Sequence, residues 1–349
     1  MTWDFSIQKV ETRRGHILPF AEEADLGRRS RQIRTISFFN SMIARKFTLA
    51  DLPLLNDWLQ TEPARKYFGV PEDWLHEIEA NLDADWIHHF IVEDGKPFAF
   101  VQHYDAHLAP LGIWSEAPLG SAGIDFLIGE LSFLGKGYGS KLVEFLVRDI
   151  RATGGFEHVV ADPTPENNAS IRLLEKAGFS AHSSGLYIKR LSDVPWSYYL
   201  AKETDIPEIT DLFYNTIQFV NIKDYTKEQV DDWSYWHSAM DKWQHGIWHD
   251  FFVKAVDGAK IIGFGSLRED GYLDYLFTHK DHQHQGVGRG LYQKLENQAR
   301  AKGHKSIYAD VSITARRFFE NLGFEVEIEQ LKKSHFLELV NYRMRKALD

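Results

Sequence analysis

The segments GIDFLIGELSFLGKGYGSKLVEF (123–145) and GYLDYLFTHKDHQHQGVGRGLYQKL (271–295) decide the fold, because they are two versions of one pattern. Each begins with a short apolar run that contains one aspartate, passes through a glycine-rich turn and continues with helical periodicity. Asp125 precedes Gly137 by 12 residues, and Asp274 precedes Gly286 by 12 residues. A single glycine-rich turn is weak evidence, but a repeated spacing around it indicates an internal duplication.

The duplication extends outward in both directions. After the helical stretch, each half has an apolar strand that ends in an aspartate, Asp162 or Asp310, and then a helix that closes in Gly-Phe. Before it, each half has a strand–turn–helix pattern (43–59 and 198–213) and two apolar runs joined by Asp-Gly, which is typical of a hairpin. The sequence therefore predicts two copies of one unit that mixes helices and strands.

A length of 349 residues also suits two domains. The segment SDVPW separates the last strand of the first copy from the first strand of the second. We expect a first domain at 43–194, a second at 195–349, and an N-terminal extension of unknown role at 1–42. The arginine cluster RRSRQIR (28–34) in this extension is interpreted as a solvated face or a docking arm.

The composition of the chain excludes several classes of chemistry and partner. The chain has no cysteine, which excludes disulfides, thiolate metal ligands and an acyl-enzyme on cysteine. We see no export signal and no apolar run of membrane-spanning length, so a cytoplasmic protein without membrane partners is expected. The net charge of −10 argues against a nucleic-acid partner. Residues 45–195 hold 13 Lys+Arg against 22 Asp+Glu, and residues 196–349 hold 20 against 23, so the first domain is the better match for a cationic small molecule.

The order of elements resembles that of the GNAT acyltransferase superfamily over nearly the full length of both halves. The resemblance implies an α/β (α+β) fold of two tandem GNAT domains, each a mixed, centrally splayed sheet flanked by helices. It also implies acetyl-CoA as co-substrate, no metal, and direct acetyl transfer to an amine in a ternary complex. The family binds acyl-CoA at a loop written Q/R-x-x-G-x-G/A that opens a helix, where backbone N–H groups and the helix N-terminus favour a pyrophosphate.

The second domain matches this loop in full at Gln283–Gly288, whereas Leu134 replaces the leading Gln or Arg in the first. Backbone N–H groups of the splayed strand near Leu127 and Ile128 are expected to polarise the thioester carbonyl. Together with these two, the resemblance implies that the following residues bind the cofactor: Gly135, Lys136, Gly137, Tyr138, Gly139, Asn167, Gln283, Gln285, Gly286, Val287, Gly288 and Gly290.

The first domain also resembles the aminoglycoside 6′-N-acetyltransferases, through FVQHY, GIDFL, LGKGYGSKLV and DPTPENNASIRLLEKAGF. This likeness implies that Asp125 is catalytic and that the acceptor is bound by Gln102, Tyr104, Trp114 and Asp162. Siderophore-building lysine acyltransferases share much of the pattern, and amino acids or polyamines stay open as acceptors. The second domain resembles a bacterial GNAT group of unsettled substrate, with Asp274 in the catalytic place.

Several alternatives remain open at this stage. Asp125 and Asp274 could be structural hydrogen-bond acceptors, and Asp162 could form only an Asx turn before Pro163. One copy, more readily the second, could be a non-catalytic acyl-CoA-binding or bracing module. A Rossmann loop and a metal at His279, His282 and His284 are both disfavoured, the first by the preceding hairpin and the second by the ligand spacing.

Two further features concern the reaction and the second domain. Many GNAT enzymes have a tyrosine that protonates the departing thiolate, but Leu174 and Phe319 stand at that position here. The thiolate-protonating group is therefore unassigned. Trp233, Trp236, Trp243 and Trp248 occupy a helical stretch and are interpreted as core or pocket wall.

Overall fold

The computed structural model describes residues 35–38, 42–109 and 113–348. The chain divides into two compact units between Asp193 and Val194, one residue from the boundary expected from SDVPW. We call them unit 1 and unit 2. The arginine cluster at 28–34 and most of the expected extension lie outside the described residues. The extension's residues Thr35–Phe38 form a strand, β1, that pairs with β2 (Met42–Lys46), so the sheet begins before residue 43.

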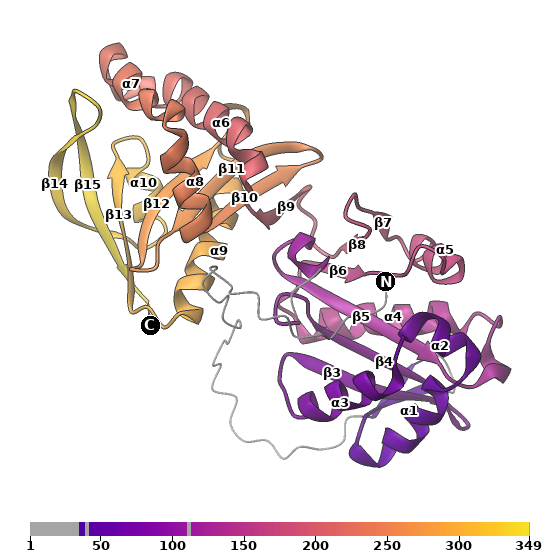
Figure 1. Ribbon diagram of the computed structural model, residues 1–349. Coiled ribbons are helices and arrows are strands. Elements are labelled where there is room, and N and C mark those ends of the chain that lie inside the picture. Colours follow the sequence, from indigo (N-terminus) through magenta and orange to yellow (C-terminus); the bar gives the residue numbers. More distant parts are fainter. Residues whose placement is uncertain (1–34, 39–41, 110–112, 349) are drawn as a thin grey trace. The chain divides into compact units, whose positions relative to one another are not determined.

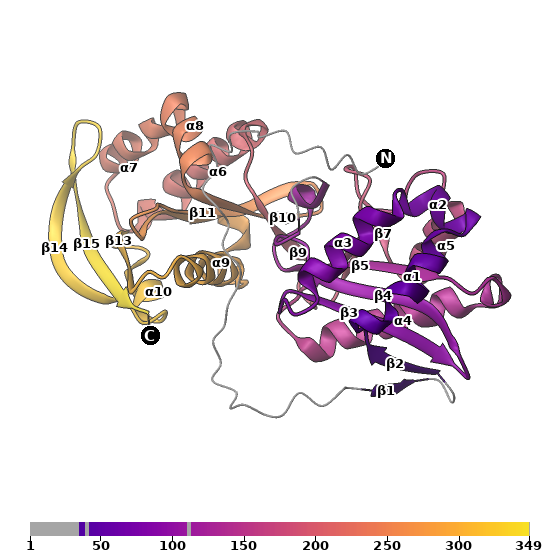
Figure 2. The ribbon, with the colours of Figure 1, turned by 60° about the horizontal axis from the view of Figure 1, so that its bottom comes forward.

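Unit 1 contains one sheet with helices on both faces (Figures 1 and 2). Its order is β1-β2-β3-β4-β5-β6-β8-β7. The remaining elements are β3 (Ile87–Asp94), β4 (Pro97–Asp105), β5 (Ser121–Ile128), β6 (His158–Ala161), β7 (Ser180–Ala181), β8 (Tyr187–Arg190), α1 (Leu52–Leu59), α2 (Glu62–Phe68), α3 (Pro71–Asn81), α4 (Tyr138–Thr153) and α5 (Asn168–Lys176).

Apolar side chains of both faces of this sheet are buried, because β3, β4 and β5 lie between two helical layers. One core joins the sheet to α4 and includes Phe98, Phe145 and Leu146. The other joins it to α1–α3 and includes Trp58 and Phe100. The sheet thus brings residues from α3 and from β4–β6 within reach of each other.

Unit 2 repeats the plan with one seven-stranded sheet in the order β14-β15-β13-β12-β11-β10-β9. Its elements are β9 (Trp196–Leu200), β10 (Phe251–Asp257), β11 (Lys260–Leu267), β12 (Tyr272–Thr278), β13 (Ser306–Ser312), β14 (Glu325–Lys333), β15 (Glu338–Ala347), α6 (Ile206–Phe219), α7 (Lys227–Ser234), α8 (Met240–His249), α9 (Val287–Ala301) and α10 (Arg316–Glu320).

The sheet of each unit splays at its centre. The parallel strands β5 and β6 pair only from Ser121 to Gly123 on β5, and β12 and β13 pair only at Tyr272 and Leu273. Beyond these residues the central strands separate, which leaves the edge of β5 from Ile124 onward, and that of β12 from Asp274 onward, without a partner strand on that side. The predicted tandem of mixed, centrally splayed sheets flanked by helices is confirmed.

Within the part of the chain that the structure describes, no helix is both long enough and apolar enough to cross a membrane.

Candidate active site

Both glycine-rich loops have the same backbone conformation. Gly135 and Gly137 have φ of 70° and 82°, and the residues at the same places in unit 2, His284 and Gly286, have φ of 58° and 97°. Left-handed conformations are accessible to glycine at little cost, which explains three of these four residues. His284 is the one non-glycine residue with positive φ in the described chain. The shared conformation turns successive backbone N–H groups toward one side, as in an anion-binding nest.

These loops fit a phosphate-bearing cofactor. A Cβ built on Gly135, Gly137 or Gly286 would meet no atom within 4 Å, so open space lies beside the loop. Gly137 and Gly286 are the N-caps of α4 and α9, and neither helix has a side-chain cap bond. The first-turn N–H groups therefore remain available to an anion.

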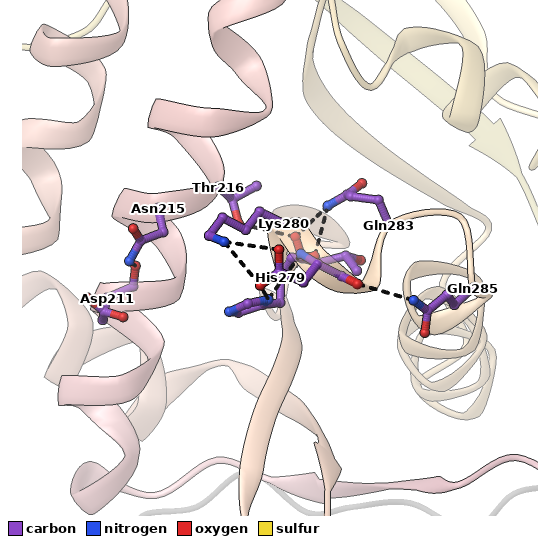
Figure 3. A network of polar contacts seen from close by, with 9 residues as sticks. Asp211, Asn215, Thr216, His279, Lys280, Gln283 and Gln285 are labelled. Atoms are coloured by element: carbon purple, nitrogen blue, oxygen red, sulfur yellow. Dashed lines mark hydrogen bonds and ion pairs between the residues drawn. The ribbon is translucent and has the colours of Figure 1, made fainter.

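The two loops are held in place by different contacts. In unit 2 the Gln283 side chain donates to the carbonyl oxygen of Thr278 at 2.6 Å, and that of Gln285 donates to the carbonyl oxygen of Asp281 at 3.2 Å (Figure 3). Both amides thus brace the loop from within. Unit 1 has Leu134 in place of Gln283, and there the ring of Tyr138 packs against Phe98 and Phe133.

The hydroxyl of Tyr138 donates to Asp94, so this side chain supports the loop rather than facing a ligand. Val287 of unit 2 is fully buried in the same way. Both residues can offer a cofactor only their backbone N–H groups. Lys136, by contrast, is exposed within the loop of unit 1.

Some of the residues expected to bind CoA also have a structural role. A Cβ on Gly139 would lie 2.4 Å from Leu173, and a Cβ on Gly290 would lie 1.8 Å from the Tyr198 hydroxyl. These glycines therefore allow close packing. Gly288 is less crowded, since its Cβ would lie 3.2 Å from Thr278. The side-chain oxygen Oδ1 of Asn167 accepts a hydrogen bond from the backbone N–H of Ser170 and caps α5.

The splayed part of β5 contains Leu127 and Ile128. The Leu127 side chain is buried against α1–α3, and Ile128 packs on the α4 side. Their side chains thus belong to the two cores, while the edge of β5 beyond Gly123 has no pairing with β6. Backbone groups on this edge are available to a carbonyl oxygen placed between the splayed strands.

Asp125 lies on this same strand and anchors a cluster of polar side chains. Gln102, its register partner on β4, donates to the Asp125 carboxylate at 2.9 Å. The hydroxyl of Tyr104 forms a second hydrogen bond to it. The Tyr104 ring fits because its own register partner is Gly123, where a Cβ would lie only 2.4 Å from the ring.

Two more carboxylates, those of Asp162 and Glu77, lie close enough to Asp125 to be affected by its charge. Burial and the charge of Asp125 raise the pKa of Asp162 to about 7, and the same two causes raise the pKa of Glu77 on α3. Burial also raises the pKa of Asp125, although Gln102 and Tyr104 oppose the shift. None of the three carboxylates has an ion-pair partner among the described residues. Buried like charges of this kind favour a protonated carboxyl, or a bound cation that replaces the proton.

The cluster continues into the core. The Gln102 side-chain oxygen lies 3.0 Å from Nδ1 of His89, which is 3% exposed, so a buried imidazole orients the amide that holds Asp125. Burial lowers the pKa of His89 to about 4, which keeps this ring neutral at physiological pH. Trp114 packs edge-on against Tyr104 at a centroid distance of 5.7 Å. The structure thus brings together Gln102, Tyr104, Trp114, Asp125 and Asp162, as the sequence predicted for a site.

Unit 2 differs at the corresponding place. Asp274 on β12 accepts a hydrogen bond from the Arg268 guanidinium at 2.7 Å. Asp310, which follows the spacing of Asp162, forms ion pairs with Lys332 and Arg343. Burial alone would raise the pKa of Asp310, but the two cations hold it at about 2. Asp274 and Asp310 are therefore compensated by cations, whereas burial and the Asp274 charge raise the pKa of the neighbouring Asp250 to about 6.

Other residues singled out in the sequence lie in the cores. Leu174 and Phe319 are 1% and 4% exposed, so neither position opens onto a site in its present form. Trp243 is fully buried in unit 2, whereas Trp248 is half-exposed. Within the described residues, no group of three or more histidine, aspartate or glutamate side chains is placed to hold a metal ion.

Sequence reasoning missed Glu77, His89, Lys242 and Arg268. Glu77 and Lys242 lie on helices α3 and α8, among other charged residues, and nothing in their spacing distinguishes them from a solvated face. Arg268 follows β11 in a polar turn. Only the packing of these elements beside β5 and β12 identifies them.

Comparison with known proteins supports the duplication. Models of the acetyltransferase (GNAT) domain match residues 48–185 and 221–346. The aminoglycoside N(6′)-acetyltransferase type 1 of Klebsiella pneumoniae is 32% identical over 151 residues, which are 40% of this chain and 74% of that protein. The uncharacterised N-acetyltransferase YafP of Escherichia coli (strain K12) is 27% identical over 141 residues, 40% of this chain and 89% of that one.

Among solved structures, an aminoglycoside acetyltransferase in complex with coenzyme A is 30% identical, covers 43% of this chain and 95% of its own, and has a TM-score of 0.39.

Proposed function

Since the chain belongs to the GNAT acetyltransferase family, with two such domains in tandem, we propose that unit 1 transfers the acetyl group of acetyl-CoA to an amine of a polycationic acceptor, an aminoglycoside 6′-amine. The observation that carries the proposal is the cluster of Glu77, Asp125 and Asp162, three carboxylates that have no ion-pair partner among the residues that the structure describes. Burying like charges is costly, and a cationic acceptor supplies the missing counter-charge. The kinship with the Klebsiella aminoglycoside acetyltransferase supports the choice among polycations.

The acceptor is held before it reacts. Asp125, fixed by donors from Gln102 and Tyr104, keeps its orientation and attracts the ammonium group. Glu77 reaches the cluster from α3 and binds a further amine of the acceptor. Because burial raises the pKa of Tyr104 well above its ordinary value, its hydroxyl stays a neutral donor.

The amine must lose a proton before it attacks. A general base is most effective when its pKa lies near the working pH, and Asp162, with a pKa of about 7, meets that condition. We therefore assign proton acceptance to Asp162 and electrostatic anchoring to Asp125. This exchanges the two roles expected from the sequence, within the same pair of residues. Like charges at one site titrate together, so the pair shares the work.

Acetyl-CoA would supply the thioester when bound, and the loop at Gly135–Gly139 would hold its pyrophosphate. The nitrogen lone pair attacks the acetyl carbonyl, and the carbon–sulfur bond breaks. Backbone N–H groups at the open edge of β5 stabilise the developing oxyanion. No side chain is assigned to the thiolate, because Leu174 is apolar and buried. A thiol pKa of about 8.5 allows water to protonate it.

The test compares two acceptors that differ at one position. Neomycin has a 6′-amine and paromomycin has a 6′-hydroxyl, so the full-length chain should release CoA with the first much faster than with the second. The acetylated position is then read by mass spectrometry and NMR. Turnover of both drugs at equal rates, or of neither, would refute the 6′ assignment.

A further inference from the structure

Unit 2 has cations where unit 1 has carboxylates. Arg268 pairs with Asp274 at 2.7 Å, and its guanidinium lies 4.9 Å from the centre of the Tyr272 ring. The Lys242 ammonium lies 5.7 Å from the centre of the Tyr275 ring, next along the strand from Asp274. Both cations therefore sit over aromatic rings of β12, on either side of the aspartate.

Lys242 corresponds in place to Glu77. Glu77 lies on α3, the helix before β3, and Lys242 lies on α8, the helix before β10, which occupies the same place in unit 2. The central aspartate of each unit acts on this group: the Asp125 charge raises the pKa of Glu77, and the Asp274 charge opposes the lowering of the Lys242 pKa by burial. Corresponding helices of the two units thus place a carboxylate near Asp125 and an ammonium group near Asp274.

Two charged groups near Asp274 have no ion-pair partner among the described residues, the Lys242 ammonium and the carboxyl of Asp250, whose pKa burial and the Asp274 charge raise to about 6. Arg268 compensates Asp274, and Arg343 with Lys332 compensates Asp310. Lys242 has no ion-pair partner among the described residues, only the rings of Trp236 and Tyr275. Burial lowers its pKa, and the neighbouring Arg268 and Lys332 lower it further, although Asp274 opposes them. The group that would relieve this arrangement is an anion.

We propose that unit 2 takes an amine that also bears a carboxylate, with the carboxylate bound by Lys242 and Arg268 and the amine directed to Asp274. Arg268 presents several donors in a plane and can serve Asp274 and a second carboxylate together. A polycation of the kind proposed for unit 1 would meet Lys242 and Arg268 and be repelled. The inference rests on the proposed acetyl-transfer function, and it gives the two units different acceptors.

The experiment uses the full-length chain with Asp125→Asn and Asp162→Asn together, which removes both the anchor and the base that we assign to unit 1. The acceptors are amino acids and their decarboxylated counterparts: lysine with cadaverine, phenylalanine with 2-phenylethylamine, tyrosine with tyramine. CoA release gives kcat/KM, and mass spectrometry identifies the product. We expect at least one amino acid to exceed its counterpart by about tenfold or more, the effect of one hydrogen bond to a charged group.

Substitutions of Lys242 test whether this residue causes the preference for the amino acid over its decarboxylated counterpart. Lys242→Met should remove most of the tenfold advantage of the amino acid and leave its counterpart unchanged, while Lys242→Glu should reverse the order. Lys223→Met, at an exposed lysine elsewhere in unit 2, should change neither. Equal or faster turnover of the decarboxylated amines, or an advantage that survives Lys242→Met, would overturn the proposal.

CoA binding separates this failure from failure of the proposed function. Calorimetry on the same protein, with Gly286→Glu as the reference that lacks the loop of unit 2, measures cofactor binding without any acceptor. If unit 2 binds CoA but acetylates neither member of any pair, the carboxylate-bearing acceptor is wrong while the cofactor assignment stands. If unit 2 does not bind CoA, the carboxylate-bearing acceptor and the cofactor assignment of unit 2 are both wrong.

Discussion

Asparagine in place of Asp162 should make unit 1 slower and, at high pH, more stable. The substitution keeps the size of the side chain but removes its charge and its basicity. Burial and the Asp125 charge raise the Asp162 pKa from 3.8 to about 7. That change corresponds to about 4 kcal/mol of extra free energy needed to ionise the carboxyl in the folded protein, as an order of magnitude.

The sign of the stability effect follows from proton linkage. Between pH 3.8 and about 7 the folded state binds a proton at Asp162 that the unfolded state has lost, so stability falls as the pH rises through this window. Above pH 7 the folded protein keeps the full free-energy cost of ionising Asp162. The variant does not have this cost, so its advantage should be absent below pH 4 and should approach its maximum near pH 8. At about 2–4 °C per kcal/mol, the melting temperature of unit 1 should rise by several degrees at pH 8.

The rate of acetyl transfer by the Asp162→Asn variant should fall. Loss of a general base costs about 10²–10⁴-fold, and the wild-type rise of kcat/KM with pH through about 7 should disappear. The assay is CoA release with neomycin between pH 5.5 and 9, together with thermal unfolding at pH 4 and pH 8. Asp105→Asn is the matched control, because burial also raises the pKa of Asp105 but it lies outside the carboxylate cluster. It should affect stability without removing activity.

Two results would contradict this reasoning. A variant that keeps kcat/KM within about threefold would show that Asp162 is not the base, since general-base help is worth far more. In that case Asp125→Asn becomes the decisive variant. A variant that melts lower than wild type at pH 8 would show that the carboxylate is compensated in the folded protein.

Three further predictions follow from the contacts. Glu77→Gln should raise KM for neomycin about tenfold with little change in kcat, because it removes one charge-assisted hydrogen bond to the acceptor; an unchanged KM in initial-rate assays would place Glu77 outside the acceptor site. Gly137→Glu and Gly286→Glu should each abolish one of two CoA sites by strain at positive φ and charge repulsion; calorimetry that finds one CoA per wild-type chain would contradict the two-site assignment. Gly290→Ala should destabilise unit 2 by about 1–3 kcal/mol, because its Cβ would lie 1.8 Å from the Tyr198 hydroxyl; chemical unfolding followed by tryptophan fluorescence measures this, and an unchanged midpoint would show that Tyr198 moves aside freely.

The sequence by itself determined the duplication, the fold and the anion loops. These features depend on local spacing: an aspartate 12 residues before a glycine, a turn that needs left-handed residues, and a helix that starts directly after it. Backbone conformation and amphipathic periodicity are encoded within a few residues, so they can be seen without knowing what packs against them. The site formed by Gln102, Tyr104, Trp114, Asp125 and Asp162 was expected from the family resemblance and not from local spacing.

The tertiary structure decided what each of these residues can do. Asp125 and Asp274 occupy the same place in the repeat, yet one faces Glu77 and Asp162 and the other faces Arg268 and Lys242. A carboxylate gains or loses its proton according to burial and to charges a few ångströms away, and those charges come from elements far along the chain. Spacing alone cannot distinguish a site that awaits a cation from one whose central aspartate is already compensated by a cation, because that difference arises only when α3 or α8 packs beside the splayed strand.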